Sequence, residues 1–239
     1  MHKRSLAILG FLLVAASPAL AEVFKDYFLG TTLDGRWTWA CEDECNGRVN
    51  SGLVLNAVSG NRQAAIGTVH KAYSWVAAES QRTYQFTVGD WKITTNSHVS
   101  ARLFLVGNGA GAQPEAFSDF NKPNVLMAKL DLWQGVFYWN LFVKTDSPQA
   151  NVDDDKFKLT WMNVGIIATG RTFGVTLNRN QARLWWRTEQ GKRFESEPVP
   201  IPAQAFSDDG TFYIGVKNDT GEPFGPEQTV GISSAAVNP

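Results

Sequence analysis

The sequence predicts an all-β protein built as a two-sheet antiparallel sandwich. Runs in which apolar and polar side chains alternate with a period of two recur along the chain, and this is the pattern of half-buried strands. No long segment carries apolar residues at the i, i+3, i+4 and i+7 spacing of an amphipathic helix. Clusters of Gly, Asn and Asp separate the alternating runs, as turns do between strands. Many short strands around one continuous core are typical of a sandwich rather than of two domains.

The start of the chain has the features of a secretory signal peptide. Lys3 and Arg4 precede an apolar stretch from Leu6 to Ala16, and small residues follow up to Ala21. The apolar stretch is too short to span a bilayer, so residues 1–21 are expected to be a cleaved leader rather than a retained anchor. Residues 22–239 then form a single domain that is secreted or periplasmic, and no later stretch is long enough to span a membrane.

The expected strands follow one another with short connections. Residues 198–202 and the tail after Asp219 are expected to be loops, because neither has a clear period-two pattern. The strands are predicted over residues 23–29, 53–58, 64–73, 83–88, 99–106, 125–133, 136–144, 158–164, 172–177, 182–188 and 211–216.

Charge excludes some classes of partner. The formal net charge of the whole chain is −1, and loss of Lys3 and Arg4 with the leader lowers it to −3. A chain with this net negative charge is not attracted electrostatically to nucleic acid or anionic lipid. We therefore expect no nucleic-acid partner and no membrane insertion after leader cleavage.

The two cysteines lie close together in the sequence. Cys41 and Cys45 enclose Glu42-Asp43-Glu44, and two neighbouring thiols in an oxidising compartment are expected to form a local disulfide. A zinc site is disfavoured because no histidine or further cysteine lies nearby. The bridge closes a short loop, so its stabilisation is expected at the low end of the usual range.

A hairpin is predicted around Gln134-Gly135. With this pair as a two-residue turn, Asp131 lies opposite Tyr138 and Lys129 opposite Asn140. One face of the hairpin is then a core, and the other carries charged, amide and aromatic side chains. The core face is formed by Leu130, Leu132, Phe137, Trp139, Leu141 and Val143, and the polar face by Lys129, Asp131, Trp133, Tyr138 and Asn140.

A second hairpin, turning over residues 178–181, repeats this division. Gly174 lies opposite Trp185, which leaves room over the backbone for the indole or for a ligand laid on it. A one-residue slip in register would invert both faces, so the pairing is itself a prediction. The core face is formed by Phe173, Val175, Leu177, Ala182, Leu184 and Trp186, and the outer face by Gly174, Thr176, Arg183, Trp185 and Arg187.

The polar faces of both hairpins have the composition of a sugar-binding surface. A pyranose ring offers an apolar C–H face to an indole and hydroxyl groups to Asp, Asn, Arg and Lys side chains. The alternative is that these aromatic rings only cover the outer side of a sheet, since much of any protein surface is apolar. The residues expected to bind carbohydrate are Lys129, Asp131, Trp133, Tyr138, Asn140, Arg183, Trp185 and Arg187.

Four short segments resemble the concanavalin A-like lectin/glucanase superfamily. They are residues 24–28 (FKDYF), 33–37 (LDGRW), 52–55 (GLVL) and 209–216 (DGTFYIGV), and the similarity in strand order covers most of the chain after the leader. The resemblance implies a jelly roll of two curved antiparallel sheets whose concave face binds carbohydrate. It also implies two functional groups, namely lectins and binding modules on one side and glycoside hydrolases or polysaccharide lyases on the other.

The sequence does not favour catalysis. Glycoside hydrolysis requires two carboxyl groups, and the glucanase branch of the superfamily supplies them from an E-x-D-x-E strand. The nearest match, residues 129–133, keeps only the central acid, Asp131. Glu195 and Glu197 lie on one side of an extended segment but precede Pro198, which indicates an exposed strand end. For His98, the role of an ordinary surface residue is favoured over that of a lyase base.

Calcium is the one cofactor that the sequence leaves open. Asp153-Asp154-Asp155 offers oxygen ligands, although a solvated loop is the favoured interpretation because the spacing fits no calcium loop. We therefore expect an exported, lectin-like protein that binds a polysaccharide or glycan without a catalytic residue. The alternatives are a hydrolase or lyase of the same fold, and a non-catalytic envelope or adhesion module that binds protein.

Overall fold

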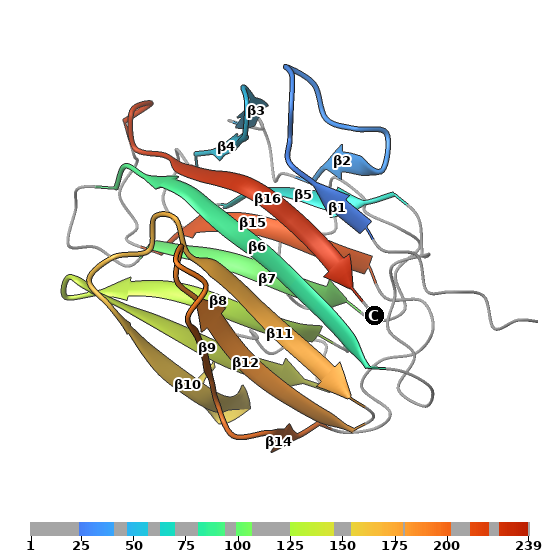
Figure 1. Ribbon diagram of the computed structural model, residues 1–239, viewed down its shortest axis with the longest axis vertical. Helices are drawn as coiled ribbons and strands as arrows, with labels where there is room; N and C mark the ends of the chain where they lie inside the picture. Colours follow the sequence, from blue (N-terminus) through green and yellow to red (C-terminus); the bar gives the residue numbers. More distant parts are fainter. Residues whose placement is uncertain are drawn as a thin grey trace, which may run out of the picture.

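The two-sheet antiparallel sandwich predicted from the sequence is confirmed by the computed structural model (Figure 1). The structure describes residues 24–40, 47–56, 63–69, 81–93, 99–106, 125–145, 154–178, 180–201, 211–219 and 225–238. In these residues, the helical structure is limited to one 3-10 turn at Asp155–Phe157. None of the described helical segments has the length and apolar character needed to cross a bilayer. The predicted leader and both cysteines lie outside the described residues.

One sheet has nine strands among the described residues. Its main order is β13-β12-β11-β6-β16-β4-β3, while β1 pairs with β16 and β14 pairs with β12. In Figure 1 the long strands β16, β6, β11 and β12 of this sheet lie side by side. The strand bounds are β1 Phe24–Asp26, β3 Gly47–Val49, β4 Leu53–Leu55, β6 Arg82–Trp91, β11 Thr172–Asn178, β12 Gln181–Arg187, β13 Arg193–Glu195, β14 Val199–Pro200 and β16 Val230–Asn238.

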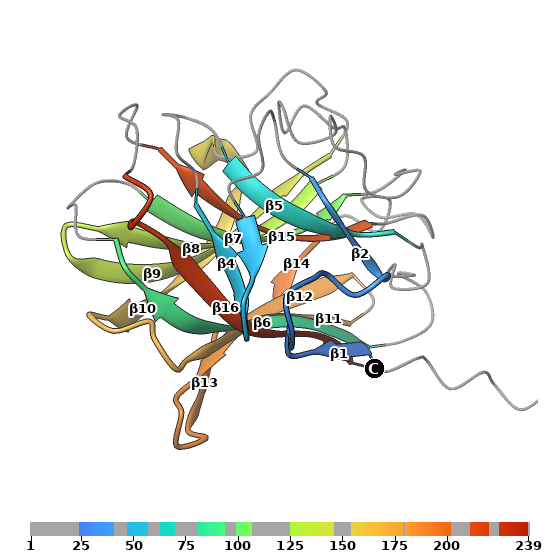
Figure 2. The same ribbon diagram turned by 90° about the horizontal axis from the view of Figure 1, so that it is seen from above.

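The other sheet has seven strands in the described part of the chain, in the order β10-β9-β8-β7-β15-β5-β2. Seen from above in Figure 2, this sheet and the nine-stranded sheet form two separate layers. The strand bounds are β2 Trp37–Trp39, β5 Gln63–Thr68, β7 Val99–Val106, β8 Val125–Trp133, β9 Val136–Lys144, β10 Lys158–Gly165 and β15 Thr211–Asn218.

Both predicted hairpins form in the predicted register. Lys129 pairs with Asn140 and Asp131 with Tyr138 in the β8–β9 hairpin. Its turn has φ of 49° at Gln134 and 78° at Gly135, and two positive φ values are what a tight two-residue turn between twisted strands requires. In the β11–β12 hairpin, Gly174 pairs with Trp185 as expected.

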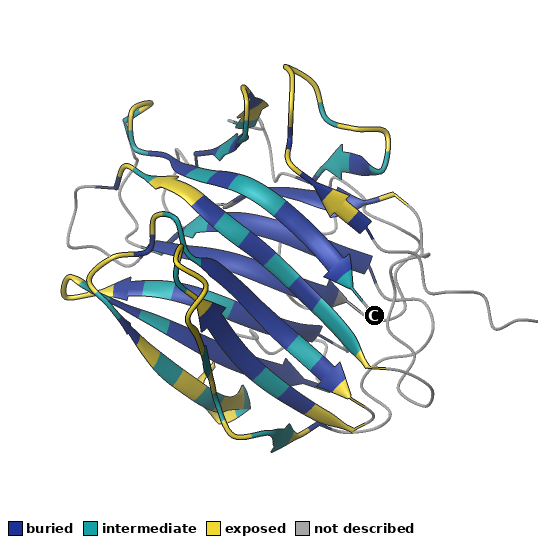
Figure 3. Ribbon diagram, in the orientation of Figure 1, coloured by how far each residue is buried: buried dark blue, intermediate teal, exposed yellow. Residues whose placement is uncertain are grey.

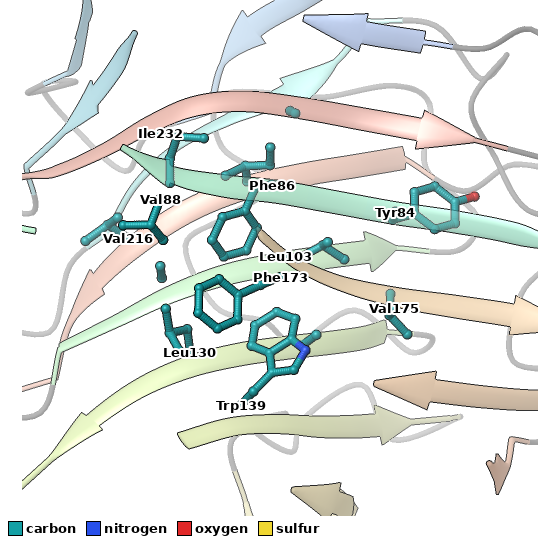
Figure 4. Close-up of a cluster of buried hydrophobic side chains, with 14 of the residues drawn as sticks. Tyr84, Phe86, Val88, Leu103, Leu130, Trp139, Phe173, Val175, Val216 and Ile232 are labelled. Carbon is teal, nitrogen blue, oxygen red and sulfur yellow. The ribbon is translucent and has the colours of Figure 1, made fainter. Parts of the chain in front are cut away.

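The core lies between the two sheets, and the predicted inward residues of both hairpins belong to it. Figure 4 shows how aromatic rings from the two sheets meet at its centre. Trp139 of β9 contacts Phe86 and Phe173 of the opposite sheet, with ring centroids 5.9 and 5.5 Å apart. The buried Trp139 indole N–H donates to the carbonyl oxygen of Gly174 at 3.2 Å, so its one polar atom is satisfied across the core. Because the inward residues of both hairpins lie in this core, the alternate residues of each strand face outward.

The tail after Asp219, expected to be a loop, instead forms a central strand. β16 lies between β6 and β4 and buries Val230, Ile232, Ala235 and Val237. Its pairing with β6 is interrupted between Gly231 and Ile232 and between Ile232 and Ser234. Such bulges change which face each following residue occupies, so no continuous period-two pattern is visible in the sequence. The short strands β2, β3, β13 and β14 were also not predicted, since two or three residues carry too little pattern.

Candidate functional site

A hollow lies on the outer side of the seven-stranded sheet, where β10, β9 and β8 run side by side. It has a volume of about 540 Å³. We call it the aromatic hollow, and its lining residues are Asp131, Trp133, Tyr138, Asn140, Asp155, Lys158 and Trp161. Four of the residues expected to bind carbohydrate therefore lie together, and Lys129 joins them through an ion pair with Asp131 at 3.4 Å.

Aromatic rings dominate the open part of this hollow. The exposed fraction is 41% for Trp133 and 56% for Trp161, values far above those of the core tryptophans. Tyr138 and Trp161 meet edge to face with ring centroids 5.8 Å apart and an angle of 64° between their planes. The rings therefore form an angled wall rather than one flat platform.

Strand periodicity explains why these rings point outward. Trp133 and Tyr138 alternate with Leu132, Phe137 and Trp139, which are all core residues. Trp161 pairs with Asn140 and follows the same alternation, because its neighbour Met162 packs against the core. Moving any of these rings to the inner side would require the whole strand to slip by one residue.

Polar groups at the base of the aromatic hollow are held in place by the backbone. The side-chain amide nitrogen of Asn140 donates to the carbonyl oxygens of Tyr138 at 3.2 Å and Lys129 at 3.4 Å. Asn140 has an exposed fraction of only 4%, so this lining residue is almost completely buried. The Lys129 and Asp131 side chains are likewise largely buried, with exposed fractions of 12% and 22%. The hollow thus joins exposed rings to fixed hydrogen-bonding groups.

The rest of this outer side is buried even though it faces away from the core. Arg102 donates to the Asp219 carboxylate at 2.8 Å, and Lys217 contacts the same carboxylate at 2.8 Å. Burial acts to raise the pKa of Asp219, but the charges of Arg102, Lys217 and Lys129 outweigh it and lower the pKa to about 2. An apolar group lies on the same side, and it consists of Ala40, Ala65, Phe104, Val125, Met127, Phe142 and Tyr213. Among the described residues of this side, the open positions therefore lie at the β8–β10 end.

The three candidate residues of the second hairpin do not reach the aromatic hollow. Arg183, Trp185 and Arg187 lie on β12 of the nine-stranded sheet and point away from the core. Because the two sheets pack face to face, their outer sides are on opposite surfaces of the molecule. The expectation that both hairpins contribute to one binding surface is therefore corrected: alternation fixes which side of a strand a residue occupies, but not which sheet the strand joins.

Trp185 is outward-facing but covered, with an exposed fraction of 2%. A Cβ atom on Gly174 would lie 2.2 Å from Trp185 Cζ2, so the indole fills the space above this glycine. The Arg193 guanidinium lies over the ring at 4.3 Å from its centroid, and the indole N–H donates to Thr176 Oγ1 at 3.2 Å. The room over Gly174 is thus taken by the protein's own ring, and the same strand carries Arg183 and Arg187 at its surface.

Three lining residues of the aromatic hollow were missed in the sequence, namely Asp155, Lys158 and Trp161. Trp161 carried a usable signal, because it alternates with Met162 and Val164 within a predicted strand. What the sequence did not reveal is that β10 pairs with β9, which places Trp161 beside Asn140. Asp155 and Lys158 come from a 3-10 turn and a strand start, where no periodicity applies.

Among the residues considered for catalysis or metal binding, Asp131 and Asp155 both line the aromatic hollow, and the others lie elsewhere or outside the described residues. His98 and Asp153 lie outside the described residues, and Asp154 is paired with Lys156 at 3.0 Å. Glu195 forms ion pairs with Arg183 and Arg193 on the opposite sheet from the hollow. Within the described ranges no group of three or more His, Cys, Asp or Glu side chains is placed to hold a metal ion.

Comparison with known proteins identifies the fold. No protein-family model and no curated protein sequence matches the chain. Among solved structures, the Ca2+-bound exoplasmic/lumenal domain of VIP36 is similar with a TM-score of 0.61 and 12% identity, over 90% of this chain and 89% of that one. Lectin II from Ulex europaeus is similar with a TM-score of 0.56 and 8% identity, over 91% and 97%.

A longer chain among the solved structures contains a similar module. GH43B of the Bacteroides ovatus xyloglucan PUL matches 90% of this chain with a TM-score of 0.58 and 11% identity, but this chain covers only 38% of that one. These neighbours and the two-sheet topology together show that the chain has the concanavalin A-like jelly-roll fold. The resemblance expected from the sequence is confirmed at the level of fold.

Proposed function

From the concanavalin A-like fold and the aromatic hollow, we propose that this protein is an exported lectin-like protein that binds a glycan at the β8–β10 end of the seven-stranded sheet. One observation carries the proposal: the exposed rings of Trp133 and Trp161 line one hollow together with Tyr138 and the backbone-bonded amide of Asn140. Export is inferred from the leader-like residues 1–21, and a Cys41–Cys45 disulfide is part of the same proposal.

The chemistry of the hollow suits a sugar. Aromatic rings bury the C–H face of a pyranose and remove apolar area from water, which is the main favourable contribution. Asp131 and Asn140 offer fixed groups for hydroxyl hydrogen bonds, and Lys158 offers a donor. The hollow holds two carboxylates and, with Lys129, two ammonium groups, so its charges balance and favour a neutral sugar.

Structural neighbours support a sugar ligand. The VIP36 domain has a form bound to Ca2+ and Man3GlcNAc, and the Ulex europaeus lectin UEA-II has a complex with galactose. The proposal assigns no residue to calcium, because the part of the chain that the structure describes holds no group of three or more His, Cys, Asp or Glu side chains for a metal ion. Glycan binding measured with and without a chelator tests whether calcium takes part.

The test is a titration of neutral oligosaccharides from cell walls and extracellular matrices, followed by indole fluorescence. Wild-type protein is expected to give a saturable change with at least one of them. Trp161→Ala and Trp133→Ala should each weaken binding by about tenfold or more, equivalent to about 1.4 kcal/mol per tenfold. The matched control is Tyr27→Ala, since Tyr27 is 51% exposed and belongs to the segment after β1 of the other sheet. No saturable change with any glycan would contradict the proposal.

A glycoside hydrolase is the second candidate, and one observation favours it: Asp131 and Asp155 line the same hollow. Hydrolysis by the usual route needs two carboxyl groups, one as acid and one as base or nucleophile. The measurement is the release of reducing ends from the glycan that binds. Activity abolished by both Asp131→Asn and Asp155→Asn, with binding weakened far less than activity, would identify an enzyme rather than a lectin.

A further inference from the structure

A second hollow lies on the opposite surface of the molecule, on the outer side of the nine-stranded sheet. It is formed where β6, β11, β12 and β13 run side by side and has a volume of about 350 Å³. We call it the guanidinium pocket, and the residues that matter most to its chemistry are Thr83, Thr176, Gln181, Arg183, Arg193 and Glu195. In Figure 3, buried and partly exposed positions alternate along β6 of this sheet, while β11 and β12 are mostly buried.

Arg193 is held in a fixed position by a stack of contacts that starts at Gly174. The glycine leaves space for the Trp185 indole, which hydrogen-bonds to Thr176 and is buried. The Arg193 guanidinium carbon then lies over that indole at 4.3 Å from the ring centroid. A guanidinium over an indole keeps its N–H groups at its edge, where they remain available to a ligand.

Glu195 joins Arg193 to Arg183. Its Oε1 accepts from Arg193 Nε at 2.5 Å and its Oε2 from Arg183 Nη1 at 2.8 Å. The hydrogen bond from Arg183 is the main cause that lowers the pKa of Glu195, so the carboxylate is charged at neutral pH. Two guanidinium groups facing one carboxylate leave a net charge of +1 in the pocket.

The two guanidinium groups retain donors beyond those that Glu195 uses. Each guanidinium has five N–H groups, and the ion pairs to Glu195 involve one nitrogen of each. Arg183 and Arg193 are part-exposed, with side-chain exposed fractions of 42% and 44%, so both are accessible. Paired guanidinium groups bind carboxylate and sulfate oxygens with matching geometry.

The rest of the lining favours a saccharide as the carrier of that anionic group. Thr83 and Thr176 present hydroxyl groups 3.1 Å apart, and Gln181 adds an amide. These groups match sugar hydroxyls. The Trp185 ring is covered by Arg193, so it offers no open face for stacking. Recognition in this pocket therefore depends on charge and hydrogen bonds rather than on aromatic stacking.

We propose that the guanidinium pocket is a second binding site, which takes the carboxylate or sulfate group of an acidic saccharide on the N–H groups of Arg183 and Arg193 that Glu195 does not use. The site is independent of the aromatic hollow, because the two lie on opposite surfaces of the sandwich. A failure to bind an acidic saccharide here can therefore be observed separately from a failure to bind a neutral glycan at the aromatic hollow. With both sites occupied, one molecule would join a neutral glycan to an acidic one.

The test is isothermal titration calorimetry of the whole protein with four probes: glucuronate, glucose 6-sulfate, glucose and inorganic sulfate. The proposal expects saturable binding of glucuronate or glucose 6-sulfate that weakens as NaCl is raised, and no binding of glucose at this site. Stronger binding of the sugar-borne anion than of inorganic sulfate identifies a saccharide site. Equal or stronger binding of inorganic sulfate would overturn the saccharide part of the proposal.

Two substitutions with opposite effects separate a binding role from a structural one. Arg183→Gln removes a charge-assisted donor and is expected to weaken binding of the anionic saccharide by about tenfold or more. Glu195→Gln removes the competing carboxylate and is expected to strengthen binding of the same saccharide. A purely structural ion-pair cluster would give neither change, and Tyr27→Ala serves as the surface control. Absence of anion binding by wild type, or binding that both substitutions leave unchanged, would overturn the proposal.

Discussion

Gly174→Ala tests the contact stack that covers the outer side of β12. A Cβ atom at this position would lie 2.2, 2.4 and 2.9 Å from three atoms of the Trp185 indole, which is closer than any real contact. The ring therefore has to move, and it then loses its hydrogen bond to Thr176 and its contact with Arg193. Overpacking costs about 1–3 kcal/mol and the lost hydrogen bond about 1 kcal/mol, so the expected decrease in unfolding free energy is about 2–4 kcal/mol.

The assay is equilibrium unfolding in urea, with Gly35→Ala as the matched control, because nothing lies within 4 Å of a Cβ atom placed there. In a Trp185→Ala background the Gly174→Ala change should cost less than about 0.5 kcal/mol, since the clash is gone. A cost of the same size in both backgrounds would refute the reasoning. So would a cost in wild type as small as that at Gly35.

Three further predictions concern stability. The pKa of Asp219 is about 2 in the folded protein against an ordinary 3.8, so ionised Asp219 contributes about 2 kcal/mol to the unfolding free energy at pH values above 3.8. This contribution is lost as the pH falls from 3.8 through about 2. Urea unfolding of wild type and Asp219→Asn should therefore show a difference in unfolding free energy that shrinks across this pH range. Trp139→Phe should cost about 2 kcal/mol in the same assay because it removes the hydrogen bond to Gly174 and leaves a cavity, and no loss would contradict that role. Ile232→Ala should cost about 2–5 kcal/mol if β16 is a core strand, whereas a loop residue would cost almost nothing.

Local alternation was enough to predict the register of both hairpins. In β8 and β9, each inward apolar residue is followed by an outward residue, and the Gln134-Gly135 turn sets which residues are opposite. A slip by one residue would expose Leu130 and bury Asp131, so only one register satisfies the pattern. The same reasoning placed Gly174 opposite Trp185.

Long-range pairing could not be predicted in the same way. β12 joins the nine-stranded sheet through β11 and β6, and β8 joins the other sheet through β7. These pairings bring together residues far apart in the chain, and no local pattern specifies them. For this reason Trp185 and Trp133 were both assigned to one carbohydrate-binding face, although they lie on opposite sides of the sandwich.

Burial on the outer sides also depends on contacts that alternation does not include. Trp185 is covered because Arg193, from a strand too short to be predicted, lies over it. Trp161 lines the aromatic hollow because an edge strand pairs with β9 through two register shifts. In both cases the sequence gives the side of the strand on which a residue lies, and the neighbouring strand determines whether solvent or a ligand reaches it.

The central claim is that the β8–β10 end of the seven-stranded sheet is a glycan-binding surface. The most direct measurement is to follow the tryptophan indole N–H signals by NMR while a neutral oligosaccharide is added. We predict that the signals of Trp133 and Trp161, which line the hollow, shift and saturate together, while that of the covered Trp185 stays in place. Saturable binding that leaves Trp133 and Trp161 unchanged, or no shift with any glycan, would contradict the account.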